Sequence, residues 1–496
     1  MDPNDLTPAE RRVWQAFPTG AEVDFRKDGE AQDDPPGEPA PDDPAQAEGW
    51  GPERTVRAEV LRALLLSSPA AGTEVPALRV SGARIRGVLN LQYGTVAHPV
   101  RLMGCHFERT PNVYGAQTRQ LNLSGSFLPG LRAATLRVEG VLRMTGCRVR
   151  GEVRLGGARI TGALFLDGAH LGAGQGRVLQ LNQARIDDDL WAPGLRAEGM
   201  VRLSGAQVAG AVNLEDAVLR HAGDVALDAE NLVAGAGLRG RGLQARGQVE
   251  MRGAKITGQL DLTEAGLSNP GGVALRATSC TIGELWLRRA APIEGTVNLR
   301  RSQFDLMHAT PEVWPEVVRL DGLTYGALSP RLPARERLAL LERDEEGYVP
   351  HAYEQLAAAY RRVGDDAASR TVQLARQRRH RRLQPWYARI WGVAQDVTVG
   401  YGYRPVRAAA WLLVLLAIGT VAFALHHPPP AERGKGPDFN PFIYTLNLLL
   451  PIVDFGQAKA FNPKGAYQWL SYGFIAAGWI LATTIVAGVT RAVSRQ

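Results

Sequence analysis

The sequence predicts a mainly β protein, a parallel β-helix of short repeats followed by α-helices and two transmembrane helices. Three observations support this prediction. Residues 76–330 contain an internal 48-residue repeat, residues 331–395 carry apolar residues at helical spacing, and residues 396–496 contain two long uncharged stretches. Repeats of this length indicate a solenoid, and uncharged apolar stretches of about 20 residues indicate bilayer spans.

The repeat is defined by the pattern Gly-x-(Val/Leu)-x-(Leu/Met). It starts at Gly151, Gly199, Gly247 and Gly295, which gives the 48-residue period. A second copy of the pattern lies within each of the first three repeats, at Gly162, Gly210 and Gly258. Each repeat divides into eight runs of about five or six residues, which suggests two coils of four faces. Alternating apolar residues in each run are expected to point inward, with Gly and Ala at the corners.

This pattern resembles the pentapeptide-repeat type of β-helix, with a looser unit. The resemblance implies a right-handed quadrilateral coil, and degenerate copies extend it from about residue 82 to about Tyr325. Because a solenoid needs its ends covered, the segment 53–75 is predicted to hold a capping helix, over Glu53–Leu65. Within residues 1–52, Asp28–Ala47 is rich in Pro, Asp, Glu and Ala, and is predicted to be a disordered linker.

The net charge of +7 conceals an asymmetry along the chain. Residues 1–56 hold 5 basic and 14 acidic residues, whereas residues 76–330 hold 29 basic and 22 acidic ones. A net basic solenoid argues against mimicry of DNA, and no nucleic-acid partner is predicted. The 3 cysteines are too few and too scattered for a disulfide framework, so they are predicted to be small buried hydrophobic residues.

Residues 331–395 predict amphipathic helices, the longer one (351–383) broken near Gly364. The pair is similar to a tetratricopeptide-like hairpin and is expected to act as a cap and spacer. Its end is strongly basic. Anionic lipid headgroups are the expected contact for Arg376, Arg378, Arg379, Arg381 and Arg382.

The last segment, 396–496, predicts a membrane domain, with spans at 408–425 and 469–489. Arginines gather before the first span and after the second, which places both termini in the cytoplasm. The N-terminus lacks a signal-peptide pattern, in agreement with that orientation. Between the spans, residues 441–453 are apolar but too short to cross, so they predict an interfacial helix or a re-entrant loop. Asn447 and Asp454 are the candidate pore or loop residues.

Three short motifs are interpreted as structural. Residues 398–402 spell a potassium-channel filter but precede the first span, so they predict an interfacial turn. Residues 235–240 fit GxGxxG inside the repeat, which predicts β-helix corners rather than a dinucleotide site. Asp187, Asp188 and Asp189 predict a solvated turn. No catalytic, cofactor-binding or metal-ligating residues are predicted, which favours a non-catalytic protein.

Segments spread over nearly the whole chain, including TVGYGYRP and FNPFIYTLNLLLPIVDFGQ, resemble a family of uncharacterised bacterial membrane proteins. Members are sometimes labelled membrane-associated oxidoreductases. The resemblance implies a bacterial inner-membrane location but transfers no catalytic residue and no cofactor.

Three functions are weighed. The leading one is a membrane-anchored scaffold whose cytoplasmic solenoid presents a surface to a protein partner. The first alternative is a channel or transport protein that uses residues 441–453; it requires a homo-oligomer, because two helices enclose no conduit. The second alternative is a membrane-associated oxidoreductase, which is supported only by the label given to some members of the resembled family.

Overall fold

The computed structural model describes residues 5–26, 42–66, 75–172, 176–382, 405–431, 437–450 and 453–493. The chain divides into two compact units, Met1–Ala359 and Tyr360–Gln496.

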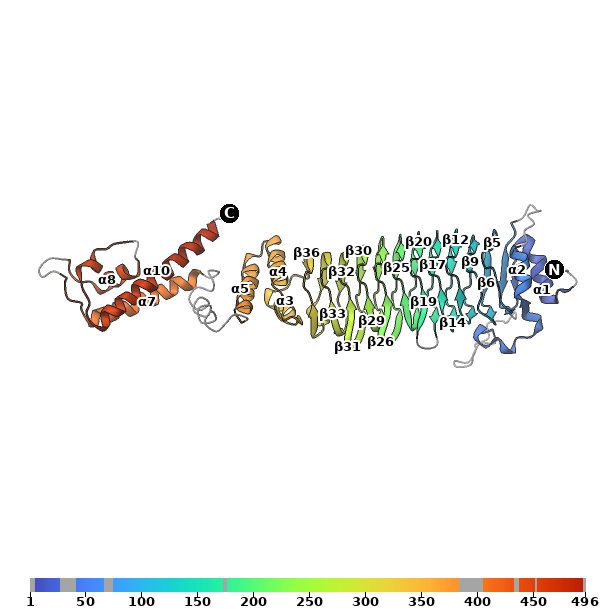
Figure 1. Ribbon diagram of the computed structural model, residues 1–496, viewed down its shortest axis with the longest axis horizontal. Coiled ribbons are helices and arrows are strands. Elements are labelled where there is room, and N and C mark those ends of the chain that lie inside the picture. The colour runs from blue at the N-terminus through green and yellow to red at the C-terminus, as the bar shows by residue number, and fades with distance from the viewer. Residues whose placement is uncertain are drawn as a thin grey trace. The chain divides into compact units, whose positions relative to one another are not determined.

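The first unit is a parallel β-solenoid of about 11 turns, which confirms the prediction of a parallel β-helix. Each regular turn contributes four short strands, one to each of four faces. The first and second faces form a 20-stranded sheet, and the third and fourth faces form a 16-stranded sheet. In Figure 1 the labelled strands of the 20-stranded sheet lie along the upper side of the solenoid and those of the 16-stranded sheet along the lower side.

The strands of the 20-stranded sheet are short in the early turns and longer in the late ones. The first face holds β5 (Thr95–Val96), β8 (Gln117–Thr118), β12 (Arg137–Val138), β16 (Arg159–Ile160), β20 (Arg185–Ile186), β24 (Gln207–Val208) and β27 (Val233–Ala234). The second face holds β1 (Val23–Asp24), β3 (Leu78–Ser81), β6 (Val100–Met103), β9 (Leu121–Asn122), β13 (Leu142–Arg143), β17 (Leu164–Phe165), β21 (Leu190–Trp191), β25 (Ala211–Asn213) and β28 (Gly237–Arg239). Both faces then continue in β30 (Lys255–Asp261), β32 (Thr281–Leu287), β34 (Gln303–Ala309) and β36 (Thr324–Ser329).

The 16-stranded sheet is built in the same way. The third face holds β2 (Thr55–Arg57), β4 (Arg84–Arg86), β7 (His106–Phe107), β10 (Phe127–Leu128), β14 (Arg148–Val149), β18 (His170–Leu171) and β22 (Arg196–Glu198). The fourth face holds β11 (Leu131–Arg132), β15 (Val153–Arg154), β19 (Arg177–Gln180) and β23 (Met200–Arg202). The sheet continues in β26 (Val218–Asp228), β29 (Gln244–Glu250), β31 (Gly266–Arg276), β33 (Glu294–Asn298) and β35 (Val317–Arg319).

Each 48-residue repeat is a pair of unequal turns. On the third face the successive parallel partners are Glu198, Arg220, Arg246, Ser268 and Glu294. The step from Glu198 to Arg220 is 22 residues, and the step from Ser268 to Glu294 is 26 residues. Shorter and longer steps alternate along the series. The longer turns have extra residues between the third and fourth faces, where the pairing register shifts. The two coils predicted for each repeat are therefore present.

The glycines that start each repeat stand where a side chain has no room. At Gly199, Gly247 and Gly295 the φ angles are +145°, +121° and +123°, a region that L side chains rarely adopt. A Cβ atom there would lie 2.4, 2.4 and 2.6 Å from the carbonyl oxygens of Gly176, His221 and Asn269. Those carbonyls belong to the longer turns, so the 48-residue spacing of these glycines follows the spacing of the longer turns.

The core of the solenoid consists of stacked aliphatic side chains, one row for each face. On the first face Ile160, Ile186 and Val208 are successive partners and are buried. The three cysteines are also buried and free, as predicted. Burial raises the thiol pKa to about 12 at Cys105 and Cys147 and to about 11 at Cys280, so all three are held as neutral thiols.

The N-terminal segment joins the solenoid instead of only preceding it. β1 pairs with β3 and β2 pairs with β4, both in parallel, so the β-helix includes strands outside the predicted range 76–330. The helix predicted over Glu53–Leu65 begins only at Ala58, because residues 55–57 form strand β2 and pair with β4. The helical elements of this end are α1 (Pro8–Ala16), η2 (Phe17–Thr19), η3 (Pro44–Gly49), η4 (Pro52–Arg54) and α2 (Ala58–Leu66).

The linker predicted over Asp28–Ala47 is only partly described. Residues 28–41 lie outside the described part of the chain. Residues 42–47 enter η3, where the Ala47 side chain is fully buried, so these residues are ordered and the prediction was wrong for them. Burial of an alanine and of nearby Trp50 supplies the apolar contact that the composition of the segment did not suggest.

An ion pair between a buried carboxylate and a partly exposed arginine fixes α1 to the solenoid. Glu10 forms a capping box with Thr7, and its carboxylate also accepts hydrogen bonds from the Arg57 side chain at 2.7 Å and from the Arg57 backbone N–H at 3.0 Å. Burial alone would raise the pKa of Glu10, but the hydrogen bonds from Arg57 and Thr7 outweigh it and lower the pKa to about 2.

This carboxylate predicts a loss of stability in acid. Because the pKa of Glu10 is lower in the folded chain than its usual 4.5, its contribution is present above pH 4.5 and is lost as the pH falls towards 2. The contribution is on the order of 3 kcal/mol. Glu10→Gln is expected to lower the melting temperature of the β-helix at pH 7 and to flatten its decline between pH 4.5 and 2. Glu139→Gln, at an exposed carboxylate, is the control; equal pH profiles for the two variants would contradict the prediction.

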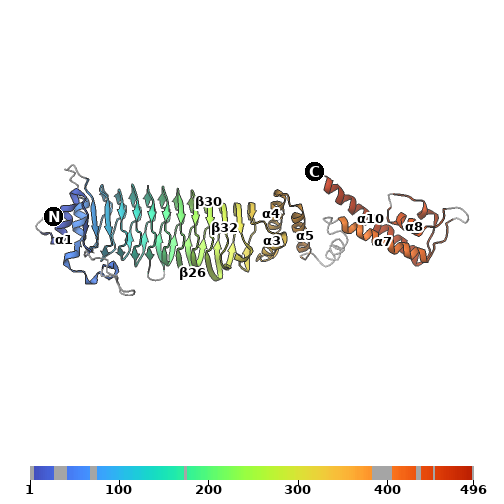
Figure 2. The ribbon, with the colours of Figure 1, turned by 180° about the vertical axis from the view of Figure 1, so that it is seen from behind.

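The C-terminal end of the solenoid is covered by helices α3 (Ala334–Leu341) and α4 (Pro350–Arg362), seen beside the last strands in Figure 2. The backbone N–H of Leu320 donates to the Asp344 carboxylate at 2.8 Å, and the Gln355 side chain donates to the Tyr325 carbonyl at 2.8 Å. A short helix, η5 (Pro311–Val313), precedes β35. In the next segment α5 (Asp366–Arg382) begins after Gly364, at the predicted break, where φ is +76°.

The second unit contains a helical bundle made of α7 (Pro405–Leu425), α8 (Pro441–Leu449), α9 (Gln457–Ala460) and α10 (Ala466–Val493). Over the described residues, no helix combines the length and the apolar character that a bilayer crossing requires.

Candidate functional site in the segment between α7 and α10

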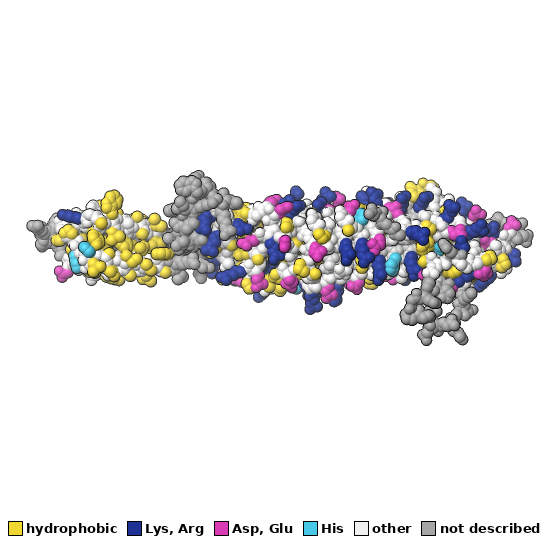
Figure 3. All heavy atoms as spheres, turned by 90° about the horizontal axis from the view of Figure 1, so that it is seen from below, with side chains coloured by type: hydrophobic (Ala, Val, Ile, Leu, Met, Phe, Trp, Pro, Cys, Tyr) yellow, Lys and Arg dark blue, Asp and Glu magenta, His cyan; other side chains and the backbone are white. Residues whose placement is uncertain are grey.

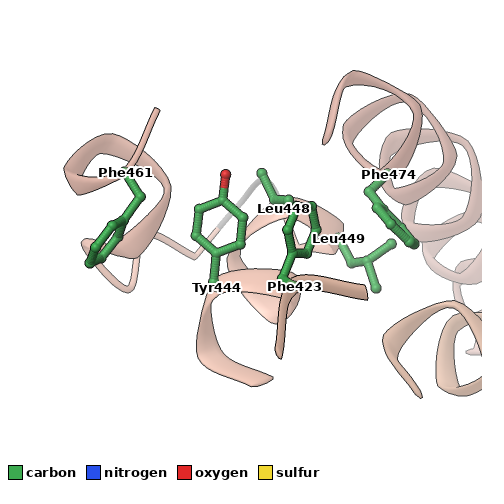
Figure 4. Close-up of a cluster of buried hydrophobic side chains, with 6 residues drawn as sticks. All are labelled: Phe423, Tyr444, Leu448, Leu449, Phe461 and Phe474. Atoms are coloured by element: carbon green, nitrogen blue, oxygen red, sulfur yellow. The ribbon is translucent and has the colours of Figure 1, made fainter. Parts of the chain in front are cut away.

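Helix α8 packs against both α7 and α10 through a small aromatic and aliphatic core (Figure 4). Phe423 of α7 is fully buried, and its ring lies edge-on to Tyr444 of α8, with centroids 4.9 Å apart. Phe474 of α10 lies 6.2 Å from Phe423. The buried members of this core are Phe423, Tyr444, Leu448, Leu449, Phe461 and Phe474. The predicted apolar segment 441–453 is therefore a helix for residues 441–449, and residues 451–452 lie outside the described part.

Two glycines let α8 approach its neighbours closely. A Cβ atom on Gly419 of α7 would lie 2.3 Å from Cγ2 of Thr445. A Cβ atom on Gly478 of α10 would lie 2.3 Å from the carbonyl oxygen of Leu449. Small residues at such positions are how apolar helices bring their backbones together. In the sequence, the signal for this close approach is that both glycines interrupt otherwise apolar stretches.

The ends of α8 are held by side-chain amides. Asn440 caps the helix, since its side-chain oxygen accepts from the backbone N–H groups of Phe442 and Ile443 at 3.0 and 3.2 Å. Gln457 is buried, donates to the Asp438 carbonyl at 2.8 Å and accepts from the Asn440 N–H at 3.3 Å. These bonds tie the start of α8 to the start of α9.

The structure brings the two predicted candidates, Asn447 and Asp454, into the same loop. The Asn447 side-chain oxygen accepts from the Ala458 N–H at 3.1 Å, and its nitrogen donates to the Val453 carbonyl at 3.4 Å. Asn447 is nearly buried, at 9% exposure. Its amide thus closes the turn between α8 and α9.

Asp454 is exposed and pairs within the same turn. Its carboxylate accepts from Lys459 Nζ at 2.6 Å and from the Gly456 N–H at 2.8 Å. The pKa of this carboxyl is lowered, first by the hydrogen bond from Lys459 and then by the one from Gly456, with Asn447 a smaller cause. Lys459 was missed at the sequence level, although its place shortly after Asp454 in the same loop is a usable signal. The loop therefore presents an internally bonded Asp–Lys pair.

The predicted lipid-contacting arginines lie in the last turns of α5. Cations at this end of a helix interact favourably with its dipole, so the cluster has a structural role whatever it binds. Arg378 is exposed, and Arg376, Arg379 and Arg381 are partly exposed, while the side chain of Arg382 lies outside the described part.

The other motifs have the structural roles expected of them where they are described. In the GxGxxG motif Gly235 lies at a corner, whereas Gly237 begins strand β28; added Cβ atoms would fall 2.1 Å from the Ala209 carbonyl oxygen and 2.8 Å from the Gln259 carbonyl oxygen, respectively. Asp187 pairs with Arg185 at 2.8 Å, and Asp189 accepts from the Ala211 N–H at 2.7 Å. The filter-like residues 398–402 lie outside the described residues. Across the described ranges, no group of three or more His, Cys, Asp or Glu side chains is arranged to hold a metal ion.

Comparison with known proteins gives no relative: no family model, no curated protein and no solved structure matches this chain. The resemblance to a bacterial membrane-protein family therefore stays a prediction.

Proposed function

We propose that the chain is a membrane-anchored β-solenoid scaffold, in which α7 and α10 insert into a bilayer and the solenoid presents its faces to a protein partner. One observation carries the anchoring: large apolar side chains on α7 and α10 face outward. Leu413 and Leu425 of α7 are 67% and 74% exposed, and Trp469 of α10 is 77% exposed. In Figure 3 hydrophobic side chains dominate the surface of the C-terminal helices, whereas charged side chains cover the β-helix.

Lipid acyl chains are the occupant that suits this surface. The sequence is uncharged over 408–425 and 469–489. Each stretch has about the length of a bilayer crossing when it is counted with residues 408 and 483–489, whose side chains lie outside the described part of the chain. Trp469 stands at the start of the second stretch, as interfacial anchors do. We assign the bacterial inner membrane, with both termini cytoplasmic, from the placement of the arginines. The right-handed, pentapeptide-like form of the coil belongs to the same proposal and rests on the sequence resemblance.

The packing of α8 favours a re-entrant segment over an interfacial helix. Leu449 meets Gly478, which lies well inside α10, roughly 18 Å from its start along a helix that rises about 1.5 Å per residue. The end of α8 would then lie at the depth of the acyl chains. Since both polar atoms of Asn447 are bonded inside the loop, we assign it to holding this segment in shape. No observation of comparable weight supports the channel alternative or the oxidoreductase alternative.

Extraction of membranes at alkaline pH tests the anchoring. The full chain is expected to stay in the membrane pellet, because a helix in a bilayer resists carbonate. Replacing Leu413 and Val421 with Lys in one variant is expected to shift at least tenfold more protein to the supernatant, since a charge near the centre of a span costs about 2.5–3.5 kcal/mol. Val88→Lys and Val233→Lys, at exposed solenoid positions, are the matched controls. Release of the unmodified chain by carbonate would overturn the proposal.

A further inference from the structure

The basic charge of the solenoid is concentrated in about its first third. Residues 77–165 contain 13 arginines and only 3 acidic residues, whereas residues 166–330 contain 16 basic and 19 acidic residues. The resulting excess of +10 in residues 77–165 is strong enough to select partners by charge. The late turns offer no such excess, so charge recognition is confined to the early turns.

On the third face, basic and aromatic side chains form a ladder that begins in these turns, where Arg84 is paired with Glu108 at 2.7 Å. Successive parallel partners are Arg84, His106, Phe127, Arg148, His170 and Arg196. Neighbouring rungs are separated by about 4.8 Å, the spacing between strands. The His106 and Phe127 rings stack with centroids 5.0 Å apart and an interplanar angle of 9°. The Arg150 guanidinium lies 5.3 Å from the Phe127 ring centroid.

A short acidic segment of the same chain, residues 42–50, lies on this ladder; we call it the acidic strap. Both carboxylate oxygens of Asp43 accept from Nη1 of Arg148, at 2.8 and 2.7 Å. The next residue of the strap, Pro44, places its carbonyl oxygen 2.7 Å from Nδ1 of His106. The Asp43 side chain is 13% exposed and that of Arg148 is 54% exposed, so the arginine keeps room for a second contact.

The strap is held in place by a second arginine. Arg54 pairs with Asp42 at 2.6 Å, donates to the Gly82 carbonyl at 3.1 Å and stacks over Trp50 at 3.9 Å. The contacts of the strap with the ladder show what the face recognises: a carboxylate on Arg148 and a peptide carbonyl on His106. Beyond Arg148 the ladder continues with His170 and Arg196, whose side chains are exposed, as is that of nearby Arg150.

From this geometry we infer that the third face of the early turns binds an acidic peptide of a partner protein, and that the acidic strap occupies part of the same surface and competes with that peptide. The inference rests on the proposed scaffold function and gives the chemistry of its partner. A peptide is favoured because the strap itself binds through a side-chain carboxylate and a main-chain carbonyl, a pair of groups that a polypeptide offers and a nucleic acid does not.

Fluorescence anisotropy with a labelled decaglutamate peptide and the full chain in mild detergent tests this inference. Asp43→Asn keeps the oxygen that caps η3 but removes the charge on Arg148, so it is expected to strengthen peptide binding about tenfold. Arg148→Glu is expected to weaken binding at least tenfold, and Arg148→Gln is the milder variant should Arg148→Glu fold poorly. Arg185→Glu, on the first face and 64% exposed, is the charge-matched control and is expected to reduce binding less than threefold.

Two outcomes would overturn the inference. One is equal peptide affinity for the unmodified chain, Asp43→Asn and Arg148→Glu. The other is that a DNA duplex displaces the labelled peptide as efficiently as unlabelled decaglutamate, which would make the face a general polyanion site. Carbonate extraction of the same variants separates this inference from the scaffold proposal. If the proteins stay in the membrane pellet but do not bind the peptide, only the peptide site is disproved. If the unmodified chain is released, the membrane anchor is disproved.

Discussion

Replacing Gly247 with alanine is expected to lower the free energy of unfolding of the β-helix by more than about 3 kcal/mol. Two costs combine at this position. The φ angle of +121° is strained for an alanine, and its Cβ atom would lie 2.4 and 2.8 Å from the carbonyl oxygens of His221 and Asp224. Both oxygens belong to the backbone of the preceding longer turn, in the stretch of β26 between the paired residues Arg220 and Val225, so a shift of either oxygen would strain the pairing on both sides of it. A large drop in melting temperature, followed by the circular dichroism of the strands, is the expected result.

Gly223 provides the matched control for this substitution. It lies in the same longer turn, with φ of +80°, but a Cβ atom there would meet nothing within 4 Å. Gly223→Ala therefore carries only the backbone strain, about 1–2 kcal/mol. Hydrogen exchange gives a second measurement, because each turn is stabilised mainly by its neighbours: Gly247→Ala is expected to speed exchange in β26 and β29 before it does so in β15. Similar melting temperatures for the two variants would show that the close stacking of turns does not limit stability.

Replacing Gly478 with valine is expected to displace α8 from α10. The added side chain would start 2.3 Å from the carbonyl oxygen of Leu449, with the carbonyl carbon and Cα of the same residue at 2.8 Å. Because the docked face of α8 holds the buried residues Tyr444, Leu448 and Leu449, its displacement would expose the whole cluster. A cysteine placed at Leu449 reports on this directly, since that side chain is only 1% exposed. Its rate of maleimide labelling is expected to rise at least tenfold.

The control for this experiment lies on the same helix. A Cβ atom on Gly473 would meet nothing within 4 Å, so Gly473→Val is expected to leave the labelling rate of the Leu449→Cys reporter unchanged. The three native cysteines add little background, because burial holds them as neutral thiols. Equal labelling in the Gly478→Val and Gly473→Val proteins would mean that α8 is not held against α10.

Much of the solenoid could be predicted because the same steric and burial constraints recur in every turn. The eight short runs in each 48-residue copy correspond to successive strands, for example β15 to β22. The glycine at the start of each repeat stands where a Cβ atom does not fit, so its position in the repeat stays constant. The rule that Gly and Ala occupy corners was incomplete. Left-handed corners are also taken by Thr135, Gln183, Asn231 and Ser279, which follow the same period as the glycines, because an exposed side chain tolerates that backbone at modest cost.

What could not be predicted depends on contacts between distant segments. β1 and β2 are two and three residues long, too short to give a periodic signal, and they become strands only because β3 and β4 offer free edges. The acidic strap looks like a linker in composition, and its partner Arg148 is 105 residues away from Asp43. Likewise, the sequence predicts Asn447 and Asp454 as candidate pore or loop residues between the two apolar stretches, but their bonds to Ala458 and Lys459 are set by the fold of the loop.

The alternation of shorter and longer turns constrains how a protein of this kind can change its length over evolution. Loss or duplication of a single turn would place two long turns or two short turns side by side, and a starting glycine would then face a neighbour without the carbonyls that shape its site. Duplication of a whole pair keeps every glycine next to the turn it fits. From about Arg148 onward the solenoid can therefore grow or shrink smoothly only in steps of two turns, each step adding roughly 10 Å, whereas the earlier turns are nearly equal in length and carry no such constraint. Homologues that differ in length within these later turns should accordingly differ by whole 48-residue repeats.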